Sequence, residues 1–196
     1  MEFFNRQNKL HFVIENNLFY SFLMWIFKWA FKKRAVWESR SVAVNCVVLV
    51  TLDDGTGPFI LISRRGPNAA DFKGKMNIVA GYLDWDESGT EAVLREAWEE
   101  CGINLEELKG KNKVLADNLT DPWHVKTKPN ENKQNVALRY GLKVKLSTNI
   151  LPTLTTIHNE IPGEVETAQW VKEEEINHYE WAFNHDEVIK EYLRLL

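Results

Sequence analysis

Residues 81–103 read GYLDWDESGTEAVLREAWEECGI, with charged residues and glycines at regular intervals. The order is G-x(5)-E-x(7)-R-E-U-x-E-E-x-G-U, where U is an aliphatic residue. The second half of the stretch is rich in Ala, Leu and Glu, which favour helix. Ser88 and Glu91 have the spacing of a capping box, and Gly102 supplies the left-handed residue that commonly ends a helix. The pattern therefore predicts a helix of about three turns that follows a loop.

Three carboxylates of this helix, Glu96, Glu99 and Glu100, lie at i, i+3 and i+4, which places them on one face. Like charges at this spacing repel each other, and a bound divalent cation removes the repulsion. Carboxylate oxygens are ligands that Mg²⁺ and Mn²⁺ prefer. Arg95 lies beside the cluster, where its forked guanidinium can brace the carboxylates.

The stretch resembles the Nudix box at every specified position. The resemblance implies an α/β fold over residues 41–196, namely the Nudix-type α/β/α sandwich with a mixed sheet. It also implies an enzyme, a Nudix pyrophosphohydrolase that uses Mg²⁺ or Mn²⁺ to hydrolyse the diphosphate linkage of a nucleoside diphosphate derivative. Carried over by position, the metal ligands are Glu96, Glu99 and Glu100, with the carbonyl of Gly81 as a further candidate. Arg95 is the brace, and Glu87 is a structural or outer-shell carboxylate.

The general base does not keep one place in this family. Some members use a glutamate of the box helix, and others use one in the loop before the final strand. That loop offers Glu160 and Glu164, which we favour over Glu166 because Glu166 can simply be an exposed strand residue. If none of these is the base, Glu99 is the next candidate.

The substrate is expected to be a small nucleotide. Arg64 and Arg65 end a predicted strand and are candidates to bind it, and Trp123 is a candidate to stack on a base, although packing is the commoner role of such a residue. The chain's ending, with Phe183-Asn184-His185-Asp186, is similar to the tail of ADP-ribose pyrophosphatase-type members, which favours an ADP-ribose-like substrate. The alternatives are hydrolysis of nucleoside triphosphates or dinucleoside polyphosphates, and a Nudix module that senses its ligand without catalysis.

Composition narrows the other classes of function. The chain has 196 residues, which is enough for one domain with an appendage. Because its net charge is -4, we do not expect a nucleic-acid partner. Cys46 and Cys101 have neither zinc-ligand nor disulfide spacing, which predicts buried free thiols and fits a cytoplasmic protein.

Periodicity predicts the remaining elements. A first strand is predicted at 10–15. Further strands are predicted at 41–52, 59–65, 76–81, 114–119, 135–146 (interrupted at Gly141) and 164–171, with a loop at 121–133, a helical turn at 173–178 and a closing helix at 184–196.

Residues 1–40 form a separate extension in this interpretation. Its stretch Leu18–Phe31, LFYSFLMWIFKWAF, predicts a helix with a wide aromatic face, too short to span a bilayer. We expect this helix to pack on its own domain or across a homodimer interface rather than on a membrane surface.

Overall fold

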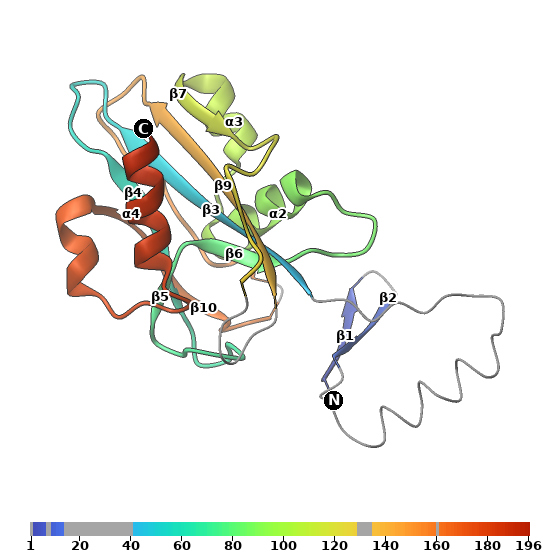
Figure 1. Ribbon diagram of the computed structural model, residues 1–196. Helices are drawn as coiled ribbons and strands as arrows, with labels where there is room; N and C mark the ends of the chain where they lie inside the picture. Colours follow the sequence, from blue (N-terminus) through green and yellow to red (C-terminus); the bar gives the residue numbers. More distant parts are fainter. Residues whose placement is uncertain (1, 7–8, 14–40, 129–134, 160) are drawn as a thin grey trace, which may run out of the picture. The chain divides into compact units, whose positions relative to one another are not determined.

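The computed structural model describes residues 2–6, 9–13, 41–128, 135–159 and 161–196 (Figure 1). The chain divides into two compact units, Met1–Ser39 and Arg40–Leu196. In the first unit, strands β1 (Glu2–Arg6) and β2 (Lys9–Val13) pair in antiparallel fashion. β2 overlaps the strand predicted at 10–15, and β1 was not predicted. The apolar helix predicted at 18–31 falls outside the described residues.

The second unit is a mixed sheet with helices on both faces (Figure 1). Its strands are β3 (Val42–Thr51), β4 (Phe59–Arg65), β5 (Met76–Asn77), β6 (Val79–Tyr82), β7 (Lys113–Asn118), β8 (His124–Lys126), β9 (Val136–Lys145) and β10 (Val165–Lys172). The order is β10-β4-β3-β9-β7, with β5 beside β4, β6 beside β3 and β8 beside β9. β3 and β9 run parallel, whereas the other described pairs are antiparallel. The predicted α/β class with a mixed sheet is confirmed.

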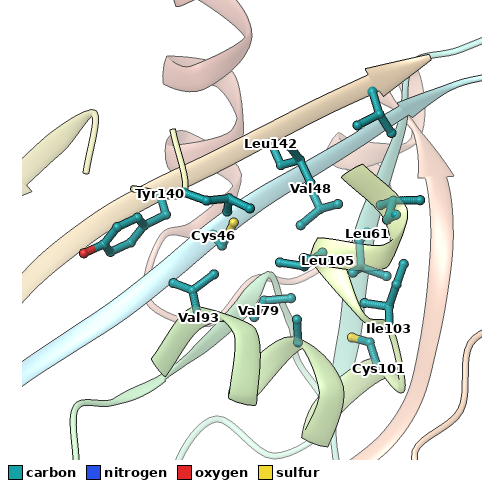
Figure 2. Packing of buried hydrophobic residues seen from close by; sticks show 14 of the residues in the cluster. Cys46, Val48, Leu61, Val79, Val93, Cys101, Ile103, Leu105, Tyr140 and Leu142 are labelled. Carbon is teal, nitrogen blue, oxygen red and sulfur yellow. The ribbon is translucent and has the colours of Figure 1, made fainter. Parts of the chain in front are cut away.

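Four helical segments complete this unit: α2 (Gly89–Cys101), α3 (Leu105–Lys111), the 3-10 helix η1 (Glu173–His178) and α4 (His185–Leu195). Strand β3 separates two cores because its side chains alternate between the faces of the sheet. Cys46 and Val48 pack with α2 and α3, as Figure 2 shows. Val47 and Leu49 pack with η1 and α4. The nearly continuous apolar run of β3 is therefore explained by burial on both sides.

Several short elements differ from the sequence prediction. The strand predicted at 76–81 is split at Ile78 into β5, which pairs with β4, and β6, which pairs with β3. Helix α3 was not predicted, and β8 lies inside the predicted loop 121–133. β9 runs through Gly141 without a break. The glycine is needed there because an added Cβ would lie 2.2 Å from Cζ of Tyr192.

Both cysteines are buried free thiols, as predicted. Within the described ranges, we find no helix with the length and apolar character needed to cross a membrane.

Candidate metal centre and substrate cleft

The capping box predicted for α2 is present. The backbone N–H of Glu91 donates to Oγ of Ser88 at 3.3 Å, and the backbone N–H of Ser88 donates to Oε2 of Glu91 at 2.8 Å. Gly102 ends the helix at a φ of 64°, in the left-handed region. A Cβ at Gly102 would also lie 2.3 Å from Cγ2 of Thr155, so this glycine lets a later loop pack on the helix end.

Arg95 ties the loop before α2 to the carboxylates on the helix. Its Nε donates to Oε1 of Glu87 at 2.7 Å, and its Nη2 donates to Oε2 of Glu87 at 3.0 Å. Nη2 also donates to the carbonyl of Tyr82 at 3.0 Å, and Nη1 donates to Glu96 and, at 3.1 Å, to Glu99. Although burial opposes the charged form, the hydrogen bonds to Glu87 and Glu96 raise the pKa of Arg95. The arginine is therefore a permanent cation that fixes three carboxylates.

Gly81 on β6 packs directly against the Glu96 carboxylate. An added Cβ would lie 2.0 Å from Oε1 of Glu96, which is far inside van der Waals contact. The first glycine of the box is thus required by the position of a predicted metal ligand.

Glu100 is buried, with 7% of its surface exposed. Its Oε2 accepts from the backbone N–H of Ala80 at 3.3 Å, and its Oε1 accepts from Nδ2 of Asn77 at 3.4 Å. Burial raises the pKa of Glu100 well above its usual range, and the nearby charge of Glu96 raises it further. A cation beside Glu100 would offset both effects.

Among the described residues, no three His, Cys, Asp or Glu side chains form a ready-made metal site. The contacts explain this, since the Arg95 guanidinium holds Glu96 and Glu99 while Glu100 is turned toward β6. The carboxylate oxygens of Glu96, Glu99 and Glu100 are ligands that a hard divalent cation prefers. A bound cation would also offset the repulsion between their charges.

A cleft of about 180 Å³ opens on the α4 side of the sheet and reaches Ala80 and the first glycine of the box, Gly81. Its cationic lining residues are Arg65, Lys126, Lys128 and Arg139, and its acidic ones are Asp71 and Glu164. The buried carboxylate of Glu100 reaches the same strand from behind through Ala80. The cationic cleft and the carboxylate helix, α2 with Glu96, Glu99 and Glu100, therefore both contact strand β6. A polyphosphate with its metal requires positive charge and carboxylates close to each other.

The start of α4 forms part of the cleft. Nδ1 of His185 accepts from the backbone N–H of Ile78 at 3.3 Å. Burial, followed by the charges of Arg65, Arg139 and Lys126, lowers the pKa of His185 to about 3. Phe183, two residues before His185, has a φ of 55°. The centre of its ring lies 5.3 Å from the guanidinium carbon of Arg65. Left-handed backbone at a non-glycine residue is strained, and such strain clusters at functional sites.

The other predicted site residues fall in different places. Glu164 and Arg65 line the cleft, whereas Glu160 lies outside the described residues. Glu166 forms a half-exposed ion pair of 3.5 Å with Arg64, which lines a second hollow together with Gly74. Because side chains alternate along a strand, Arg64 and Arg65 lie on opposite faces of the sheet.

Trp123 packs within the protein. Its Nε1 donates to the carbonyl of Tyr140 at 3.0 Å, and its ring lies 5.5 Å from that of Tyr192 in the α4 core. The residue does not line the cleft.

Sequence reasoning missed most polar residues of the cleft, among them Asn45, Lys126, Lys128, Arg139 and His185. Two of them carried a signal. Asn45 is the one polar residue between Val42 and Val50, and Arg139 is a charge inside a strand pattern. Each marks a buried polar group, which is costly unless it has a partner.

A family model agrees with this geometry. The model of the NUDIX domain matches residues 41–192. No curated protein matches this chain in sequence.

Solved structures share the fold at low sequence identity. The NUDIX domain of Shewanella oneidensis NrtR, complexed with ADP ribose, gives a TM-score of 0.60 at 16% identity, covering 86% of this chain and 99% of that one. A bifunctional NMN adenylyltransferase/ADP ribose pyrophosphatase from Francisella tularensis, complexed with AMP and a Mn ion, gives 0.57 at 19%, covering 89% of this chain and 46% of that one. This chain therefore spans about half the length of the Francisella protein. The Nudix hydrolase RenU from M. smegmatis gives 0.56 at 14%, covering 82% and 88%.

The family match extends over most of the chain and includes the whole box. It confirms the resemblance carried by residues 81–103. The chain therefore belongs to the NUDIX domain family, as its sequence predicted.

Proposed function

We propose that the chain hydrolyses the diphosphate linkage of an ADP-ribose-like nucleoside diphosphate derivative, with Mg²⁺ or Mn²⁺ held by Glu96, Glu99 and Glu100. The observation that carries the proposal is the meeting of the carboxylate helix and the cationic cleft at Ala80 and Gly81. The relatives solved with ADP ribose and with AMP and a Mn ion support this substrate class.

Different residues of the chain have different roles in this reaction. Bound metal would neutralise phosphate charge and lower the pKa of a coordinated water. Arg65, Lys126 and Lys128 bind the substrate's diphosphate from the cleft wall. Arg95 and Glu87 hold the ligand carboxylates in register. Glu164, on the cleft wall, accepts a proton from the attacking water.

Hydrolysis is tested by a screen of nucleotide substrates in Mg²⁺ or Mn²⁺ with identification of the products. ADP-ribose should give AMP and ribose 5-phosphate. Glu99→Gln should lower turnover by several orders of magnitude because it removes a metal ligand, and the exposed Glu106→Gln on α3 is the matched control. Near-normal turnover in Glu99→Gln would refute the metal assignment, and tight binding without any turnover would favour a sensing module.

The general base is tested by single Glu→Gln changes at positions 160, 164 and 166. Glu164→Gln should lose roughly a hundredfold or more in turnover at saturating Mg²⁺. Glu166→Gln is the matched control, because Glu166 pairs with Arg64 away from the cleft. If only Glu160→Gln loses activity, the base is Glu160; if none of the three does, it is Glu99.

A further inference from the structure

Two buried polar side chains lie next to each other on the wall of the cleft. Asn45 on β3 and Arg139 on β9 are register partners in the parallel pair, and both line the cleft. Their exposed fractions are 7% and 6%. Both are thus more than nine-tenths buried at the place where a ligand would enter.

Each side chain carries one unsatisfied atom. In the described part of the chain, Oδ1 of Asn45 and Nε of Arg139 are buried without a hydrogen-bond partner, and they do not bond each other. A buried polar atom without a partner is costly, so such atoms are rare and call for an explanation.

Arg139 is held in place by its other contacts. Its Nη1 bonds Oε2 of Glu191 on α4, and its guanidinium carbon lies 5.7 Å from the centre of the Trp123 ring. The guanidinium that carries the unpartnered Nε is therefore held in place on a residue that lines the cleft, and its charge is partly met by Glu191.

The chemistry of the two unpartnered atoms limits which ligand group can form hydrogen bonds with both. One is a donor and the other an acceptor, so a phosphate oxygen would satisfy Arg139 but would face the carbonyl oxygen of Asn45. A group that accepts and donates at once satisfies both. The cleft has Arg65, Lys126 and Lys128 for the phosphates.

We propose that Asn45 and Arg139 recognise the neutral part of the substrate, through a ribose hydroxyl or the donor–acceptor edge of a nucleobase. The inference rests on the proposed function, since it takes the same cleft to hold the substrate. It makes the pair a specificity determinant for the substituent that accompanies the diphosphate.

Calorimetric titration of the full chain in metal-free buffer tests the assignment with four probes: ADP-ribose, AMP, ribose 5-phosphate and pyrophosphate. Asn45→Leu removes the acceptor at similar size, and Arg139→Lys keeps the charge near Glu191 but removes Nε. Each variant should weaken binding of ADP-ribose and AMP roughly tenfold or more and leave pyrophosphate unchanged. Arg194→Lys, at the exposed end of α4, is the control.

Binding of ribose 5-phosphate, which has a sugar but no nucleobase, distinguishes a ribose hydroxyl from a nucleobase edge. If both variants weaken its binding as well, the group is a sugar hydroxyl. If they weaken binding of ADP-ribose and AMP but leave that of ribose 5-phosphate unchanged, the group is a nucleobase edge. Melting temperature separates recognition from a structural role. Asn45→Leu should melt no lower than the wild type, because it removes an unsatisfied atom.

The assignment is wrong if the variants lose affinity for pyrophosphate as much as for AMP, or if they bind every probe as the wild type does. It is also wrong if the wild type binds none of the probes. Failure of the proposed function has a different signature. In that case the variants lose affinity as expected while the wild type cleaves no diphosphate in Mg²⁺ or Mn²⁺.

Discussion

Arg95 shows why the box keeps its spacing at the residue scale. Glu87 comes from the loop and Glu99 from the helix, and both reach the same guanidinium. The forked geometry of arginine makes this possible, since a lysine presents only one nitrogen. The intervals of the pattern thus correspond to one hydrogen-bonded unit with Arg95 at its centre.

His185 gives a pH dependence of stability. Its folded pKa of about 3 lies below the ordinary value of 6.5, so the unfolded chain takes up the proton first as the pH falls. The stability that neutral His185 contributes is complete above about pH 6.5 and is lost as the pH falls toward 3. His185→Asn keeps an acceptor for the N–H of Ile78 and does not titrate.

Between pH 6.5 and pH 4.5 the wild type should therefore lose unfolding free energy relative to His185→Asn, on the order of 1 kcal/mol per pH unit. Urea unfolding at several pH values measures the difference. Parallel curves for the two proteins would mean that His185 is not held neutral.

At the scale of elements, the approach of β6 to α2 sets the position of Glu96, a proposed metal ligand. Gly81→Ala places a Cβ 2.0 Å from Oε1 of Glu96, and Arg95 prevents that carboxylate from simply moving away. Turnover should fall at least tenfold, because displacement of a ligand by about 1 Å costs on the order of a hundredfold in rate.

Gly110→Ala on α3 is the matched control. A Cβ there meets nothing within 4 Å, and alanine favours helix more than glycine does. This variant should keep full turnover and gain about 0.5–1 kcal/mol in unfolding free energy. Steady-state kinetics and thermal melts measure both variants, and unchanged turnover in Gly81→Ala would contradict the packing argument.

The longer elements could be predicted from sequence because their signals are local. Helix α2 has a capping box and a terminal glycine, and β3 has an uninterrupted apolar run. α3 and β8 are short, and β8 exists only through its pairing with β9. Part of the cleft was missed for the same reason, since Asn45 and Arg139 meet through parallel pairing of strands far apart in the chain. The box could be predicted, whereas the residues that distinguish substrates could not.

At the scale of the whole molecule, charge is distributed unevenly. The chain carries a net charge of -4, yet the cleft contains Arg65, Lys126, Lys128 and Arg139. The acidic remainder repels polyanions in general, while the cleft attracts a small phosphate ester at close range. This distribution fits a nucleotide better than a nucleic acid.

The division into units predicts the effect of removing residues 1–40. The two cores described, the carboxylate helix and the cleft all lie within Arg40–Leu196, and the family match begins at residue 41. A chain of residues 41–196 should therefore fold cooperatively and keep turnover within about twofold of the full chain, because a domain with its own core can fold alone.

The same truncation tests the role expected for the extension. If residues 1–40 hold two chains together through the apolar stretch Leu18–Phe31, the full chain is a homodimer and the shortened chain a monomer, as light scattering would measure. Two unshortened controls, Phe19→Ser and Phe31→Ser, should weaken the dimer without changing turnover. An intact dimer of the shortened chain would place the interface in the second unit. Loss of turnover in a folded shortened chain would mean instead that the extension completes the site.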